Sequence, residues 1–262
     1  MPPEPELSHA QIASDGQDVV AAVNGLAGLV ADVDDLDDVL ARIAGLAVES
    51  VPGADGAAVT VVRAGTDAGA GRPVVLAWAV TAPIVREIDH LQYDICQEGP
   101  CLTAMQNRRA VISGSLGNDP RWPRFGARVA RLQIHSALAM PLVVRDVLVG
   151  AINVYAHQRD AFSERTLRLG EQFAGPAAGS VRNIQLLHAA STQAAQLRTA
   201  LTTRAVIDQA IGIIRSRSGG SADEAFDRLR QISQAENVKL ATIAERLVDE
   251  AVRRAHARHN QS

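Results

Sequence analysis

The sequence predicts an α+β fold: a mixed module with strands, then a helical connector, then a small C-terminal helical bundle. Two observations lead to this prediction. Short apolar runs alternate with turn signals between residues 57 and 155, as strands do. Beyond residue 162 the apolar residues recur every three or four positions, the period of an amphipathic helix. The 262 residues are enough for two modest domains.

The N-terminal region is expected to be disordered over residues 1–16 and helical from Val19. The first 16 residues are rich in Pro, Glu and Ser, and they lack the basic start and apolar core of a signal peptide. Apolar residues then fall at helical intervals from 19 to 33 and again from 39 to 47. Pro52-Gly53 is expected to end the second helix.

Five short apolar runs are the candidate strands. The first two are joined by a glycine-rich stretch, which predicts a hairpin with a loose loop. The last two flank Arg145-Asp146, and a two-residue link predicts a tight hairpin. The expected strands are 57–62, 74–80, 110–113, 136–144 and 148–155, with a helix over 123–133.

Helical sequence begins after Phe162. Ser163 followed by Glu164 makes a plausible helix start, and Pro176 is expected to kink or interrupt the helix. Beyond Pro176 the spacing approximates that of a coiled coil, which predicts a helical connector. The positions of this seam are Val181, Ile184, Leu187 or His188, Ser191, Ala195, Arg198 and Leu201.

Two further helices complete the predicted bundle. Ser221 to Glu224 reads as a capping box at the start of the first. Asn237 is expected to cap the second, where an apolar stripe runs from Leu240 to Ala251. Because the links between the three helical segments are short, we expect a compact three-helix bundle.

Composition and charge exclude several classes of protein. No window approaches 18 uninterrupted apolar residues, so no membrane span is expected. Cys96 and Cys101 are the only cysteines, which excludes a disulfide scaffold and predicts reduced thiols in the cytoplasm. Residues 191–262 hold 11 basic and 8 acidic side chains, a net of +3, whereas the rest of the chain carries −6. A basic tail on an acidic protein suits a polyanionic partner.

Three side chains are candidates for lining a ligand pocket: Trp78, Cys101 and Trp122. The alternative for a lone tryptophan is a place in the core, and a buried cysteine behaves as a small apolar residue. Histidines could ligate haem, but no supporting motif is present. We therefore expect no cofactor.

The two cysteines could also form a redox pair, or a metal site with His90. A four-residue gap is not a common zinc spacing, and a fourth ligand is lacking. The neighbouring carboxylates of Asp94 and Glu98 work against a reactive thiolate. We expect neither a bound metal nor catalytic residues.

The C-terminal sequence resembles the ANTAR family. The informative pieces are A-I-G at 210–212, A-D-E-A-F at 222–226, L-R-Q-I-S at 229–233 and N-V-K-L-A-T-I-A at 237–244. Ile211 stands where many members of the family carry lysine, so one basic contact is missing here. The resemblance implies a module, usually dimeric, that binds paired stem-loops in leader transcripts and favours the antiterminated form.

The preceding region, roughly residues 35–190, resembles the GAF domains fused to ANTAR modules in actinobacteria. The segments are LQYDICQEGPCLTAM (91–105), DPRWPRF (119–125), SALAMPL and LVGAINVYAHQRDAF. The resemblance implies a GAF-like antiparallel sheet flanked by helices that senses a small molecule, a redox cue or a protein. The expected domains are a disordered lead (1–16), a GAF-like sensor with N- and C-terminal helices (17–190) and an ANTAR-like RNA-binding helical domain (191–258).

Six side chains of the bundle are candidates for RNA contact. A small bundle cannot read the deep major groove of A-form RNA, so it must meet phosphates and splayed loop bases. Any single arginine could instead be an ordinary solvated charge, and Asn237 could be only a helix cap. The candidates are Arg204, Arg215, Arg217, Gln234, Asn237 and Lys239.

The sequence therefore predicts a cytoplasmic, signal-responsive regulator of transcription antitermination. A signal at the sensor is expected to change how the connector helices of a homodimer pair, and so to present or hide the RNA face. Two alternatives belong to other classes. One is a GAF-type, thiol-dependent methionine sulfoxide reductase with a passive tail, and the other is a scaffold that binds partner helices without RNA.

Overall fold

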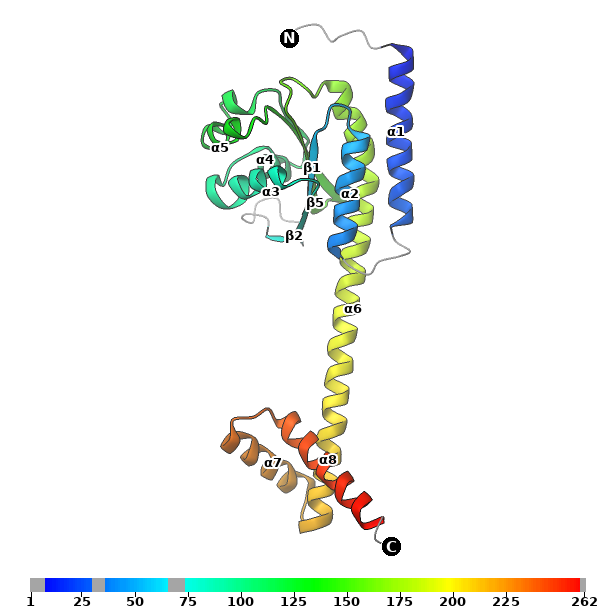
Figure 1. Cartoon of the computed structure of the whole chain (residues 1–262), viewed down its shortest axis with the longest axis vertical. Coiled ribbons are helices and arrows are strands. Elements are labelled where there is room, and N and C mark those ends of the chain that lie inside the picture. Colours follow the sequence, from blue (N-terminus) through cyan, green and yellow to red (C-terminus); the bar gives the residue numbers. More distant parts are fainter. Residues whose placement is uncertain (1–7, 30–35, 66–73, 260–262) are drawn as a thin grey trace. The chain divides into compact units, whose positions relative to one another are not determined.

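A computed structural model gives the structure of the chain and describes residues 8–29, 36–65 and 74–259. The residues divide into two compact units, 1–188 and 189–262. One long helix, α6 (Glu164–Ser218), supplies residues to both units (Figure 1). Within the described ranges, none of the helices combines the length and apolarity that a membrane span needs.

The first unit is built on a five-stranded antiparallel sheet with the strand order β2-β1-β5-β4-β3. Both expected hairpins are confirmed, since β1 pairs with β2 and β4 pairs with β5. Arg145 and Asp146 both have positive φ, 47° and 65°, as the two-residue turn of a twisted hairpin requires. The strands are β1 (Gly56–Gly65), β2 (Val75–Val80), β3 (Val111–Ser113), β4 (Ser136–Val144) and β5 (Val147–Ala156).

Helix α2 (Leu36–Ser50) and the first half of α6 cover one face of this sheet, and α1 (His9–Gly28) packs on the outer side of these helices (Figure 1). Leu26 of α1, Ile43 of α2 and Phe173 of α6 are at most 2% exposed. They share one apolar core with Val59 and Ile152, which alternate toward this face of β1 and β5.

Helix α1 begins at His9, and this corrects the expected disordered lead of residues 1–16. Ser8 caps the helix, because its hydroxyl accepts a hydrogen bond from the backbone N–H of Gln11 at 3.2 Å. Asp15 is buried and forms an ion pair with Arg165 of α6 at 2.7 Å. The cap and the ion pair anchor this part of the lead. Residues 1–7 lie outside the described residues.

Helix α6 passes through Pro176 without interruption. Proline removes one backbone hydrogen bond, but Ala177 and Ala178 directly after it are buried against the sheet and hold the helix in place. Val181 and Ile184 are each 1% exposed in the same core. These two positions therefore do not belong to the expected coiled-coil seam, because the helix's own domain covers them.

Short helices cover the opposite face of the sheet (Figure 1). Ile88, Phe125 and Tyr155 are completely buried in the core of this layer. The expected helix after Pro123 is confirmed. The helices are α3 (Pro83–His90), the π-helix η1 (Leu91–Cys96), α4 (Pro100–Asn107), α5 (Pro123–Val129) and two 3₁₀ turns, η2 (Leu116–Asn118) and η3 (Ala130–Leu132).

The second unit is the expected three-helix bundle. It consists of the end of α6, α7 (Ala222–Glu236) and α8 (Leu240–His259), packed around Ala210, Leu229 and Ile243. The capping box at the start of α7 is confirmed, since Ser221 and Glu224 bond reciprocally at 3.2 and 2.9 Å. The core is small, and several large apolar side chains of the bundle keep exposed surface.

Candidate functional site

The first unit contains a cavity of about 450 Å³ between β2, α3 and η1. Trp78 lies on the face of β2 that also carries Thr60 of the paired strand, so its ring stands at the cavity. Tyr93 and Asp94 reach it from η1, a π-helix, which is a form found frequently at functional sites. The lining residues are Val75, Trp78, Pro83, Arg86, Glu87, Asp89, His90, Tyr93 and Asp94.

A buried polar network lies next to this cavity. The hydroxyl of Tyr93 donates a hydrogen bond to Thr60 Oγ1 at 3.0 Å and lies 2.8 Å from Cys101 Sγ. The hydroxyl of Tyr155 donates to Asp89 Oδ1 at 3.2 Å. Asp89 and Tyr93 belong both to the network and to the cavity wall. A molecule in the cavity would therefore contact groups that are connected to the sheet.

Asp89 is the unusual member of this network. It is 4% exposed, and among the described residues its Oδ2 atom has no hydrogen-bond partner. Burial raises the pKa of Asp89 to about 7, although the hydrogen bond from Tyr155 acts in the opposite direction. This carboxyl group therefore gains or loses its proton near neutral pH.

Cys101 lies in the core rather than on the cavity wall. It has no exposed surface, and its backbone N–H donates to Gln92 Oε1 at 3.0 Å. Gly99 makes this contact possible, since a Cβ there would collide with Gln92 and its φ is 151°. Burial raises the pKa of the Cys101 thiol to about 12, with the Asp89 charge adding to the effect and the Tyr93 bond opposing it. Such a thiol is a poor nucleophile.

Cys96 is also buried, and neither cysteine takes part in a disulfide in the described structure. Over the residues that the structure describes, no group of three or more His, Cys, Asp or Glu side chains is placed to hold a metal ion. The redox and metal alternatives for Cys96 and Cys101 therefore gain no support from the geometry.

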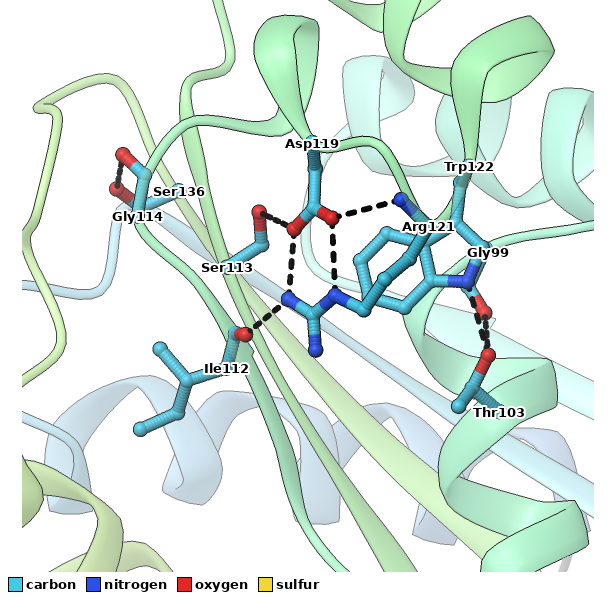
Figure 2. A network of polar contacts seen from close by, with 9 residues as sticks. All are labelled: Gly99, Thr103, Ile112, Ser113, Gly114, Asp119, Arg121, Trp122 and Ser136. Atoms are coloured by element: carbon cyan, nitrogen blue, oxygen red, sulfur yellow. Dashed lines mark hydrogen bonds and ion pairs between the residues drawn. The ribbon is translucent and has the colours of Figure 1, made fainter.

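Figure 2 shows a second polar network, centred on Asp119. This carboxylate accepts hydrogen bonds from the Arg121 side chain at 2.6 and 2.9 Å and from Ser113 Oγ at 2.7 Å. Arg121 also donates to the carbonyl of Ile112 at 2.6 Å. The network ties the segment before α5 to strand β3.

Trp122 belongs to this network and not to the cavity. It is 3% exposed, and its indole N–H donates to Thr103 Oγ1 at 2.9 Å (Figure 2). The guanidinium of Arg121 stacks over its ring, 4.3 Å from the centroid. Of the three expected pocket residues, the structure places Trp78 at the cavity, Cys101 in the adjoining core and Trp122 in a separate structural network.

We expect Asp119→Ala to lower the free energy of unfolding of the first unit by about 2 kcal/mol at pH 7, because it removes hydrogen bonds to a charged group. Burial alone would raise the pKa of Asp119, but the bonds from Arg121 and Ser113 outweigh it and the pKa is lowered. The carboxylate therefore stabilises the fold above its unfolded pKa of about 4, and this contribution is lost as the pH falls through the folded value.

Urea unfolding at pH 7 and pH 3.5 measures both effects. Asp18→Ala, at an exposed site on α1, is the control, and an equal loss at both pH values would contradict the prediction.

Arg204, Arg215 and Arg217, three of the candidates for RNA contact, lie on α6 and are exposed. Arg204 and Arg215 are 11 residues apart, which places them about 16 Å apart along the axis and within about 20° around it. Arg217 lies about 200° further round and does not share their side. The Arg215 side chain donates to the carbonyl of Gly220 at 3.3 Å, which fixes it near the link to α7.

Gln234, Asn237 and Lys239 come together at the turn between α7 and α8, and all three are exposed. Asn237 has φ 53°, and its N–H bonds to Gln234 O at 3.4 Å while Val238 N–H bonds to Ser233 O at 3.1 Å. This is the Schellman pattern of a helix end. The expectation that Asn237 caps α8 is therefore wrong. It ends α7, and asparagine tolerates this left-handed conformation.

The carboxylates that line the cavity were not predicted from the sequence. Asp89 lies on the same face of α3 as Val85 and Ile88, both completely or almost completely buried. An aspartate on an apolar helical face is the signal that could have indicated it, because a buried carboxylate is rare without a function or a partner.

Comparison with known families identifies both units. The sequence model of the GAF domain family matches residues 33–182, which is more than half of the chain. The chain belongs to the GAF domain family. The model of the ANTAR domain matches residues 195–248, so an ANTAR domain follows the GAF domain. The GAF and ANTAR domains expected from the sequence are confirmed, and the combination of a GAF domain with an ANTAR domain is that of a regulatory protein.

Solved structures show what the GAF domain resembles in fold. The GAF domain of a phosphoenolpyruvate-protein phosphotransferase from Coxiella burnetii is 14% identical, with a TM-score of 0.50 over 66% of this chain and 98% of that one. Its counterpart from Acinetobacter is 16% identical, with a TM-score of 0.45 over 70% and 99%. A type II free methionine-R-sulfoxide reductase from Thermoplasma acidophilum is 16% identical, with a TM-score of 0.41 over 56% and 92%. No sequence of a curated protein matches the chain.

Proposed function

We propose that this GAF–ANTAR protein is a cytoplasmic, signal-responsive RNA-binding regulator of transcription antitermination. Residues 9–190, which include the whole of helix α1, form the sensor, and residues 191–258 bind stem-loops in leader transcripts. The match of the ANTAR domain to residues 195–248 is the observation that carries the proposal. The net charge of +3 on residues 191–262 of an otherwise acidic chain supports a polyanionic partner.

The bundle offers two exposed places for RNA. Arg204 and Arg215 extend along one side of α6 and would contact phosphates. Gln234, Asn237 and Lys239 at the α7–α8 turn offer amide groups and a charge, which suit an unstacked loop base and its phosphate. We assign Arg217 only a general electrostatic role, because it lies on another side of the helix.

We further propose a homodimer formed through the connector. Residues 186–202 of α6 are all exposed, although they include four leucines. An apolar stripe with alternating three- and four-residue spacing would bury these side chains against a second copy. The stripe consists of Leu187, Ala190, Ala194, Leu197 and Leu201. A dimer carries two bundles, which would explain recognition of paired rather than single stem-loops.

Filter binding with the full chain tests the RNA interface. We expect RNA with two stem-loops to bind more tightly than a single hairpin or random RNA. The double variant Arg204→Ala, Lys239→Ala is expected to lose about 1–2 kcal/mol, roughly tenfold or more in affinity, and to show a shallower salt dependence. Arg131→Ala, at an exposed site in the GAF domain, is the matched control. Equal affinity for all RNAs, or no effect of the double variant, would contradict the proposal. A chain that dimerises but ignores RNA would point to a scaffold.

A further inference from the structure

We infer that the cavity of the GAF domain binds an organic cation, a protonated amine carried on a small apolar or aromatic body. The inference rests on the proposed function, because it names the class of molecule that the sensor would recognise. Three features of the cavity carry it: aromatic walls, an excess of carboxylates and one buried carboxylate oxygen without a partner among the described residues.

The walls suit an apolar body with a positive charge. Trp78 is 45% exposed and Tyr93 lies on the opposite element, so two aromatic side chains contribute to one cavity. Aromatic faces attract ammonium groups, most strongly when water is excluded. Val75 and Pro83 complete the apolar surface. A volume of about 450 Å³ is within the range of small-molecule sites.

The charges of the lining favour a cation over an anion. The lining contains three carboxylates, those of Glu87, Asp89 and Asp94, and one guanidinium, that of Arg86. His90 also lines the cavity, and its Nδ1 atom lies 2.8 Å from a carboxylate oxygen of Asp94. With His90 neutral, the lining is negative whether or not Asp89 is protonated. An anionic ligand would therefore meet repulsion on entry.

Asp89 supplies the specific contact. Its Oδ1 atom is bonded to Tyr155, and its buried Oδ2 atom is left without a donor among the described residues. A buried carboxylate of this kind is costly unless a charged donor pairs with it. An ammonium group bound in the cavity beside Asp89 would supply the counter-charge. A neutral ligand would leave the carboxylate unpaired.

Three probes of one shape test this inference by calorimetry: phenethylammonium, the neutral 2-phenylethanol and the anionic 3-phenylpropanoate. We expect phenethylammonium to bind with a dissociation constant on the order of 1 mM or tighter, as suits a fragment of its size. The neutral probe should bind about tenfold more weakly or worse, and the anion should not bind. Equal binding of the cation and the alcohol, or no binding of the cation, would overturn the inference.

Variants assign the binding to this cavity. Asp89→Asn and Trp78→Ala should each lower the affinity for phenethylammonium about tenfold. Trp78 is exposed enough to be replaced without loss of the fold. Asp146→Asn, in the β4–β5 turn, makes the same chemical change away from the cavity and should have no effect. Unchanged affinity in both cavity variants would contradict the assignment.

Protonation provides a second readout. The titratable groups around Asp89 are Tyr93, Tyr155 and Cys101, and the other charged groups of the cavity are Arg86, Glu87, His90 and Asp94. Affinity for the cation should fall as the pH drops below about 7, because Asp89 then gains a proton. Asp89→Asn should remove this dependence. A dependence that persists unchanged in the variant would contradict the role of Asp89.

The RNA assay distinguishes this inference from the proposed function. RNA binding by the chain without any probe tests the regulator, whereas calorimetry without RNA tests the cavity. If the chain binds RNA but none of the three probes binds, only the inference that the cavity binds an organic cation would be overturned. Binding of the cation by a chain that ignores RNA would overturn only the proposed output.

Discussion

Asp89→Asn is expected to stabilise the GAF domain at pH 8 and to leave its stability near pH 4 almost unchanged. Burial raises the pKa of Asp89 to about 7, whereas an unfolded aspartate titrates at about 4. Between these values the folded chain holds a proton that the unfolded chain gives up, so the stability of the native protein falls as the pH rises. The folded and unfolded pKa values of Asp89 differ by about 3, which corresponds to about 4 kcal/mol. This is an upper bound for the increase in the free energy of unfolding of the variant.

Denaturant unfolding of the native protein and the variant between pH 4 and pH 8 measures this effect. The two unfolding free energies should diverge as the pH rises from about 4 to 7 and then run parallel. Asp119 contributes the opposite slope at low pH, but it is present in both proteins and cancels in the difference. Asp146→Asn serves as the control. If the variant is less stable than the native protein at pH 8, the ionised Asp89 carboxylate stabilises the fold and the prediction is contradicted.

Leu197→Glu with Leu201→Glu is expected to convert the dimer to a monomer and to abolish tight binding of paired stem-loops. The two leucines are 58% and 68% exposed and lie on the proposed stripe of α6. Two carboxylates in an apolar seam would meet the same charges of the second copy. Loss of bivalent binding should lower affinity for two-hairpin RNA by about 100-fold or more, while affinity for one hairpin remains.

Sedimentation equilibrium and filter binding on the same samples check this prediction. Thr192→Glu with Thr199→Glu introduces the same charges on a different side of the exposed helix, so it is the matched control. The control should remain dimeric and should bind RNA as the native chain does. A native chain that is monomeric at the concentrations where it binds RNA would contradict the proposed seam.

Local sequence rules predicted most of the fold. The strands were predictable because their apolar runs end at turn residues, and Arg145-Asp146 left only a two-residue hairpin. The capping box at Ser221 was predictable because it depends on residues three positions apart. The burial of Val181 and Ile184 against the sheet was not predictable, because a helix that covers a sheet and a helix in a coiled coil show the same apolar period. Only the position of the sheet distinguishes the two cases.

The candidate sites were less predictable, because they depend on tertiary structure. Trp78 and Trp122 look alike in sequence, but alternation along β2 places one at a cavity and Thr103 holds the other in the core. Asn237 is favourable both at the start of a helix and in the left-handed conformation that ends one. The burial of the Asp89 carboxylate depends on how α3 packs against the sheet, so it could be recognised only from the structure.

Crosslinking the protein to RNA in the cell that produces it, followed by sequencing of the recovered RNA, tests whether the chain regulates transcription by binding leader RNA. We expect enrichment of leader regions that contain two neighbouring stem-loops, with crosslinks on residues of the bundle and a sharp reduction for the Arg204→Ala, Lys239→Ala variant. Recovered RNA that only follows transcript abundance, and that the double variant recovers equally well, would contradict the assignment of this chain as an RNA-binding regulator.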